Sequence, residues 1–311
     1  MHKDARIFIA DEHGLIGEVL KRRLRDDGYQ NLLGDSGNPS LIDAREVEAF
    51  FLRTLPEFVF AVGGKSGGIG ANQKLPADLM LNNLHVDCHV IDSAYRCGVK
   101  KLLYMGSSCC YPRDCLQPMQ VSSLMTGVLE STNEAYATAK LAGIKLTQAY
   151  RRQHGADMIS AIPANVFGPG DDFGVEDSHV IAALMAKMHQ AKFSQTQRVE
   201  VWGSGLPRRE FVYVTDIADA AIFLMKHYSS PVPINVGSGV DASIREIAEL
   251  IKDVVGFSGE LCFDPKKPDG MPLKSLDSSE LFALGWQPKI PLRLGLEKTY
   301  QWYLETRHTN A

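Results

Sequence analysis

The sequence predicts an α/β fold: a doubly wound parallel sheet (Rossmann-like) with a second, smaller α/β domain for a substrate. Three observations predict it. Apolar strand-like runs alternate with helical stretches in the first half, the first strand runs into a turn that contains glycine, and the pattern changes after about residue 165. Strands that alternate with helices form βαβ units, and right-handed crossovers then give a parallel sheet with helices on both faces.

The first half supplies five expected strands and four expected helices. Arg6–Ala10 (RIFIA) is a short apolar run that is typical of a buried parallel strand, and Gly14–Arg25 then places apolar residues at helical spacing. Further strands are expected at Asn31–Leu33, Phe58–Val62, Lys101–Met105 and Met158–Ile162. Further helices are expected at Ala44–Leu52, Ala77–Arg96 and Glu134–Gln153.

The second half opens with the loop-like stretch PANVFGPGDDFGVEDSH (163–179), which is rich in Gly, Pro and Asp. Short strands are expected after it at Val199–Trp202, Phe211–Val214, Ile234–Val236 and Glu260–Phe263, and helices at Val180–Gln190, Asp216–His227 and Ile244–Val255. We therefore expect a dinucleotide-binding domain of residues 1–165 with 209–236. The substrate domain would comprise residues 166–208 with 237–311.

Composition excludes several classes of protein. The 311 residues are 45% hydrophobic and 23% charged, which is ordinary globular composition. The formal charge of -4 gives no basic footprint for nucleic acid, and no run approaches the roughly 18 apolar residues of a membrane helix. The start leads directly into a strand pattern without the features of a signal peptide, so a cytoplasmic protein is expected. The six cysteines lack zinc-type pairing, so no metal site is expected.

The segment ADEHGLIG (10–17) follows the first expected strand and opens the first helix. Dinucleotide-binding loops occupy this place, because their glycines let the backbone approach a pyrophosphate at the helix N-terminus. We expect cofactor contacts from Gly14, Leu15, Ile16 and Gly17. Asp11, however, stands where the first glycine of a GxxGxxG pattern belongs, and it adds a Cβ and a negative charge. An ordinary strand-to-helix turn is the alternative.

The second expected strand runs into Gly-Asp-Ser-Gly (34–37), without Arg or Lys. An acidic residue at this place favours the free 2′-OH of NAD, whereas an arginine favours the 2′-phosphate of NADP. Asp35 is therefore an expected cofactor residue. Together with Asp11 and Glu12 it argues against tight NADPH binding and leaves NAD(H) open. The alternative is that Glu12 and Asp35 point to solvent.

Tyr136 and Lys140 form a Tyr-x-x-x-Lys pair on one face of an expected helix. A nearby cation stabilises a phenolate and brings the tyrosine pKa toward the working range. Ser107 follows an expected strand at the end where doubly wound sheets bind ligands. These three residues suit carbonyl reduction, in which Ser and Tyr hold the oxygen and Tyr donates the proton.

Several longer stretches resemble the GDP-L-fucose synthase family of extended short-chain dehydrogenases. They are GSSCCYP (106–112), LESTNEAYATAKLAGIKL (129–146), NVFGP (165–169), SHV (178–180), VWGSGLPRREFVYVTD (201–216), INVGSG (234–239) and GWQPKIPLRLGL (285–296). The resemblance runs nearly end to end. It implies a homodimer that uses NADP(H) and takes a GDP-sugar, GDP-4-keto-6-deoxy-D-mannose, through C3 and C5 epimerisation and C4 reduction to GDP-L-fucose.

The resemblance also implies an acid–base pair for epimerisation, Cys109 and His179. A C4 ketone acidifies the protons on C3 and C5, and a thiol and an imidazole are a workable pair at neutral pH. Without the motif context, Cys109 would be a buried small residue and His179 a loop or interface histidine. Cys110 is expected only to pack.

The remaining site residues come from the same resemblance. It implies substrate contacts from Lys187, Trp202, Arg209 and Asp277, and cofactor contacts from Lys140 and Asn165. The rigid fork of Arg209 suits substrate phosphates, whereas Trp202 could be a core aromatic residue. Leu273 replaces an expected basic residue, which leaves the identity of the sugar or base open.

Two other functions stay open. The acidic cofactor loop is compatible with an epimerase-only or altered-substrate homologue, acting on a GDP-dideoxyhexose or heptose, with weakened redox function. A catalytically silent Rossmann nucleotide-binding module is the other, although such a module has no need of the Ser–Tyr–Lys set.

Overall fold

The central sheet of the computed structural model has six parallel strands in the order β2-β1-β3-β4-β5-β9. The structure describes residues 1–34, 37–174 and 178–309. The strands are β1 (Ile7–Ala10), β2 (Leu32–Leu33), β3 (Phe58–Ala61), β4 (Lys101–Met105), β5 (Met158–Pro163) and β9 (Ile234–Val236). Nearly all of their residues are buried, as expected of parallel strands covered on both faces.

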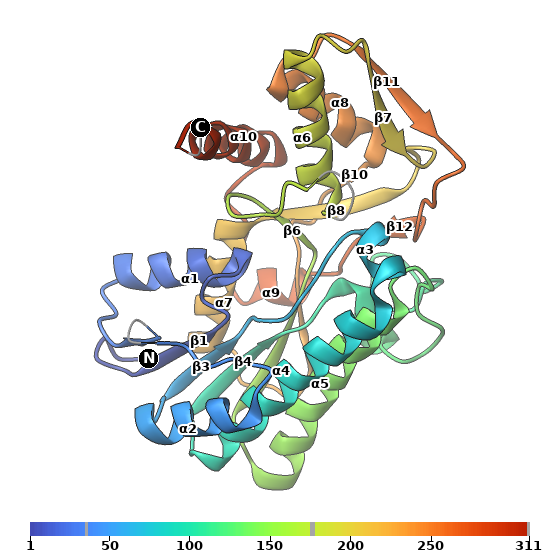
Figure 1. The fold of residues 1–311 in the computed structure, drawn as a ribbon. Coiled ribbons are helices and arrows are strands. Elements are labelled where there is room, and N and C mark those ends of the chain that lie inside the picture. Colours follow the sequence, from blue (N-terminus) through green and yellow to red (C-terminus); the bar gives the residue numbers. More distant parts are fainter. Residues whose placement is uncertain (35–36, 175–177, 310–311) are drawn as a thin grey trace.

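Helices cover both faces of this sheet (Figure 1). One face carries α1 (Leu15–Asp26) and α7 (Val214–His227), which pack on each other. The other carries α2 (Ala44–Thr54), α4 (Pro76–Arg96) and α5 (Glu134–His154), and the short α3 (Ile69–Lys74) precedes α4. The strand order reverses direction between β1 and β3, and ligands of doubly wound sheets bind at the crevice that such a reversal creates. The predicted doubly wound fold is therefore confirmed.

A second group of elements surrounds β8 (Arg208–Tyr213), which pairs in parallel with β6 (Asn165–Phe167) and β12 (Leu273–Lys274) and antiparallel with β10 (Asp241–Ser243). A separate ribbon pairs β7 (Arg198–Trp202) with β11 (Glu260–Asp264). The helices here are α6 (Val180–Phe193), α8 (Ile244–Val255) and α10 (Leu292–Thr309), whereas the short α9 (Ser279–Ala283) packs against β9 of the central sheet. In Figure 1, α6, α8 and α10 lie together at one end of the molecule, away from the central sheet.

The buried apolar side chains form two cores, one around the central sheet and one among α6, α8 and α10. The segment that starts at β8 contributes to both. Phe211 and Tyr213 lie in the second core, whereas Val212 and Val214 lie in the first. This division follows from strand geometry, because successive side chains point to opposite faces.

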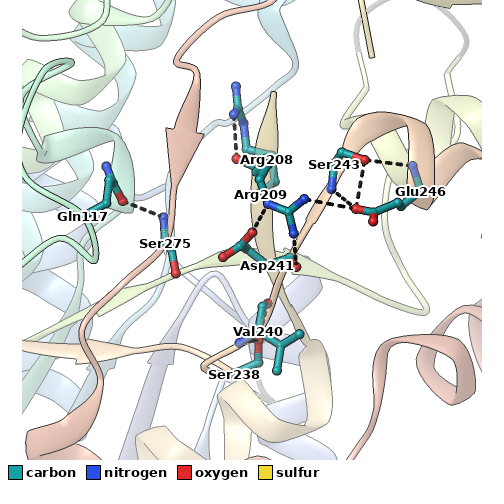
Figure 2. Close-up of polar contacts among 9 residues, drawn as sticks. All are labelled: Gln117, Arg208, Arg209, Ser238, Val240, Asp241, Ser243, Glu246 and Ser275. Carbon is teal, nitrogen blue, oxygen red and sulfur yellow. Dashed lines mark hydrogen bonds and ion pairs between the residues drawn. The ribbon is translucent and has the colours of Figure 1, made fainter. Parts of the chain in front are cut away.

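Two successive arginines on β8 are likewise directed to opposite faces. Arg208 forms ion pairs with Asp241 on β10 and with Glu246 on α8, the second at 3.3 Å (Figure 2). Glu246 also closes a capping box with Ser243 at the start of α8. Exposed ion pairs contribute little individually, but this network fixes β10 and α8 against β8 and leaves Arg209 to face the cavity described next.

Candidate active site

A cavity of about 400 Å³ opens at the carboxyl ends of the central strands and continues to the second core. Its volume is in the range of small-molecule sites. All five predicted catalytic residues line it: Ser107, Cys109, Tyr136, Lys140 and His179. Within the described ranges, no group of His, Cys, Asp or Glu could hold a metal ion, and no helix is long and apolar enough to cross a membrane.

Tyr136 and Lys140 lie one turn apart at the start of α5, and Ser107 directly follows β4. The Lys140 ammonium is buried and donates to the carbonyl of Gly63 at 3.4 Å. Burial raises the pKa of Tyr136 far above its usual range, Cys109 raises it further, and a hydrogen bond with Ser107 opposes both. The phenol is therefore protonated here, as required of a group that donates a proton to a reduced carbonyl.

A buried carboxylate that the sequence prediction missed lies behind this lysine. Asp87 on α4 is only 3% exposed, and its Oδ1 lies 3.5 Å from Nζ of Lys140. The hydroxyl of Tyr104 donates to Oδ2 at 2.6 Å, and the ring of Tyr104 lies 4.7 Å from the same Nζ. Burial raises the pKa of Asp87, against the effects of Lys140 and Tyr104. The sequence contains one signal for Asp87, since an acidic residue on the buried face of an expected helix needs a partner.

Cys109 has two nitrogen donors on its sulfur. Asn133 Nδ2 and Lys274 Nζ each lie 3.2 Å from Sγ. Burial would raise the pKa of this thiol, but the Lys274 ammonium and a contact with Ser107 outweigh burial and lower the pKa. In the adjacent Cys110, burial and the neighbouring Cys109 raise the thiol pKa to about 12. Of the two neighbouring thiols, Cys109 has the lowered pKa and Cys110 the raised one.

His179 directly precedes α6, with Nε2 3.4 Å from the hydroxyl of Ser66. Burial lowers the pKa of His179, and the Lys274 ammonium lowers it further. Lys274 thus acts on both members of the predicted acid–base pair. Lys274 is not among the residues expected from sequence, because only the pairing of β12 with β8 brings this lysine to the cavity.

The predicted substrate residues Lys187, Trp202 and Arg209 also line the cavity. The Lys187 ammonium lies 5.6 Å from the Trp202 ring centroid, and the Lys267 ammonium lies 4.8 Å from it. The Arg209 guanidinium donates to the backbone carbonyl of Asp269 at 3.2 Å. This end of the cavity therefore combines cations with an aromatic face, which suits a phosphorylated, ring-bearing ligand.

Asp277 is not brought to this cavity. It lines a separate hollow next to Gln117, and its carboxylate accepts from the backbone N–H of Ser279 at 3.1 Å. From the same region of the chain, Asp269 lines the cavity instead, and its carboxylate accepts from the backbone N–H of Ser204 at 2.7 Å. Both aspartates lie in one irregular stretch, so spacing alone did not show which one faces the site.

The predicted cofactor loop lies at the start of α1. Leu15 and Ile16 line the cavity, and Gly14 is the N-cap. A Cβ on Gly17 would overlap the carbonyl oxygen of Asp11, so the turn requires glycine at this position. The N-cap, Gly14, has no side chain that could cap α1, so the N–H groups of the first turn can donate to an anion. Together with Lys140 at the other end, these residues fit a nicotinamide dinucleotide, with the exception of Asp11, whose carboxylate is considered below.

Of the other cofactor residues, Asn165 lines the cavity and donates to the carbonyl of Glu210 at 2.8 Å. Asp35 lies outside the described residues. Glu12 does not point to solvent, contrary to the alternative weighed from the sequence. Its side chain is 3% exposed, pairs with Lys21 at 2.9 Å and accepts from Asn38 at 2.7 Å.

Comparison with known proteins shows the family of the chain. The model of the "NAD dependent epimerase/dehydratase family" matches residues 7–237. The chain is 51% identical to a putative GDP-L-fucose synthase 2 of Arabidopsis thaliana, over 98% of this chain and 93% of that protein. It is 44% identical to the GDP-L-fucose synthase of Escherichia coli K12, over 97% of each.

Solved structures of proteins that act on GDP-sugars have the same fold. A GDP-6-OMe-4-keto-L-xylo-heptose reductase from C. jejuni superposes with a TM-score of 0.93 and 32% identity, over 98% of this chain and 99% of that one. A GDP-L-fucose synthetase from Naegleria fowleri bound to NADP superposes with a TM-score of 0.88 and 28% identity, over 99% and 97%.

Proposed function

Because the chain belongs to the NAD dependent epimerase/dehydratase family, and within it to the GDP-L-fucose synthases, we propose that it is an epimerase–reductase that makes GDP-L-fucose. Its substrate would be GDP-4-keto-6-deoxy-D-mannose, epimerised at C3 and C5 and then reduced at C4. One observation carries the proposal: a single cavity holds both the Cys109–His179 pair and the Ser107–Tyr136–Lys140 set.

For epimerisation, the C4 ketone makes the protons on C3 and C5 acidic. Cys109, with its lowered pKa, removes a proton as the thiolate. His179 returns a proton from solvent to the opposite face, and its lowered pKa makes the imidazolium a stronger acid. Lys274 stabilises the thiolate form of Cys109, which is the form that removes the sugar proton.

For reduction, Ser107 and Tyr136 hold the C4 oxygen, and Tyr136 donates its proton to it. The charge of Lys140 stabilises the phenolate that this transfer leaves. NADP(H), which the N. fowleri structure contains, supplies the hydride when bound. Gly14, Gly17 and Asn165 would hold it with Lys140.

The family resemblance further supports a cytoplasmic homodimer with a GDP-sugar as its small-molecule partner. Exposed apolar side chains on α4 suit such a dimer, among them Leu81, which is 55% exposed, and Tyr95. The two cores support a division into a dinucleotide-binding part and a substrate-binding part.

The test follows GDP-4-keto-6-deoxy-D-mannose by NMR in D₂O, with and without NADPH. Deuterium should enter at C3 and C5 without cofactor, and GDP-L-fucose should form when NADPH is added. Tyr136→Phe should abolish reduction and retain exchange, whereas Cys109→Ser should slow exchange far more than reduction of a pre-epimerised 4-keto sugar. Cys110→Ser is the matched control and should leave both steps near the wild-type rate. Equal losses of both steps in Cys109→Ser and Tyr136→Phe would contradict the assigned roles.

A further inference from the structure

Asp11 occupies the turn between β1 and α1 in a conformation that favours glycine. Its φ is +67°, in the left-handed region that residues other than Gly, Asn and Asp rarely adopt. Asp11, which stands at the place of the loop's first glycine, therefore has a backbone conformation typical of glycine. What it adds is a side chain, and the position of that side chain decides its effect.

The carboxylate of Asp11 lies over the start of α1. A Cβ built on Gly14 would lie 2.9 Å from Cγ of Asp11 and closer still to Oδ2. On the other side, a Cβ on Gly63, just beyond β3, would lie 2.9 Å from Cβ of Asp11. The side chain thus fills the gap between the ends of β1 and β3 and the first turn of α1. That gap is the crevice where a doubly wound sheet receives a pyrophosphate.

Among the described residues, no cation pairs with this carboxylate. In the part of the chain that the structure describes, Asp11 forms no side-chain hydrogen bond or ion pair, and its strongest charged neighbour is the exposed His13. Burial raises the pKa of Asp11, since water is partly excluded and no partner replaces it. A bound pyrophosphate would exclude more water and bring two further negative charges against the same carboxylate.

We propose that Asp11 is an affinity-determining residue of the cofactor site, which weakens the binding of any nicotinamide dinucleotide by holding a carboxylate in the place of the pyrophosphate. The proposal rests on the proposed function, because it presupposes that the chain uses such a cofactor. Its consequence is that epimerised 4-keto sugar can leave the site before it is reduced.

The experiment measures the dissociation constants of NADPH and NADH by isothermal titration calorimetry on the full chain. Asp11→Asn removes the charge and keeps the size, and asparagine tolerates a positive φ. Asp11→Gly removes both. Each variant should tighten both cofactors by at least about tenfold, or about 1.4 kcal/mol, and by similar factors, since the pyrophosphate is common to NADPH and NADH. Glu18→Gln, an exposed carboxylate in the first turn of α1, is the matched control and should change neither constant by more than about twofold.

Three results would overturn the inference: unchanged constants in both Asp11 variants, tightening of one cofactor only, or an equal effect of Glu18→Gln. If no variant binds either dinucleotide, the inference and the reductase half of the proposed function fail together. The absence of deuterium exchange at C3 and C5 would refute only the epimerase half and would leave the comparison of binding constants valid.

Discussion

Replacing Lys274 by Met should raise the pKa of the Cys109 thiol. The Lys274 ammonium lies 3.2 Å from Sγ and favours the charged thiolate, so its removal shifts the equilibrium toward the neutral thiol. A hydrogen bond to a charged group contributes about 1.5–3 kcal/mol, and about 1.4 kcal/mol corresponds to one pKa unit. The expected rise is therefore about 1–2 units, with Asn133 still donating to the sulfur.

The assay is the pH dependence of Cys109 alkylation by iodoacetamide, followed on the Cys109 peptide by mass spectrometry. At a fixed pH below the thiol pKa, each unit by which the pKa rises lowers the thiolate fraction, and with it the alkylation rate, by about tenfold. Deuterium exchange at C3 and C5 should slow by about 10–100-fold at the same pH. The loss of Lys274 should also raise the pKa of His179, since the same ammonium lowers it.

Lys267→Met is the matched control, because this lysine lies against Trp202 rather than against the thiol. It should leave the alkylation profile unchanged. An alkylation midpoint that does not move in Lys274→Met, or that moves to lower pH, would refute the assignment of Lys274 as the group that stabilises the thiolate.

Four other substitutions test the site and the fold. Gly143→Ala should destabilise the protein by about 1–3 kcal/mol in chemical denaturation, because its Cβ would overlap the Tyr104 ring; an unchanged midpoint would contradict this packing. Asp269→Ala should raise KM for the nucleotide sugar by about tenfold through a lost charged hydrogen bond, whereas Asp277→Ala should leave KM within about twofold; the reverse order would restore the assignment made from sequence. Asp87→Asn should slow reduction at least about tenfold by unbalancing the buried charge next to the catalytic lysine, without slowing C3 and C5 exchange; equal losses would indicate a general structural defect.

The sequence predicted the helices and strands that carry the catalytic residues because their periodicity is regular and local. α10 is not among the expected helices, although it has the same pattern, since Leu292, Leu296 and Tyr300 recur every four residues. The two-residue strands are different. Leu32–Leu33 is an apolar pair between Asn31 and Gly34, whereas Leu273–Lys274 is defined only by its pairing with β8 and has no periodicity to detect.

For the site, motifs predicted the residues on regular elements, and long-range packing decided the rest. Lys274 reaches Cys109 across 165 positions of sequence, and no local pattern contains that information. Asp87 could be suspected from its helix face, but its pairing with Lys140 depends on how α4 packs on α5. The roles of the individual site residues stay predictions until the variants are measured.

The alternation of Phe211 and Tyr213 with Val212 and Val214 has a mechanical consequence. One short segment is anchored in both cores, so a rigid rotation of one core against the other would have to pull alternate side chains of the same strand from their packing. The catalytic groups are contributed from both sides of this segment. Their spacing is therefore fixed by one segment that is packed into both cores.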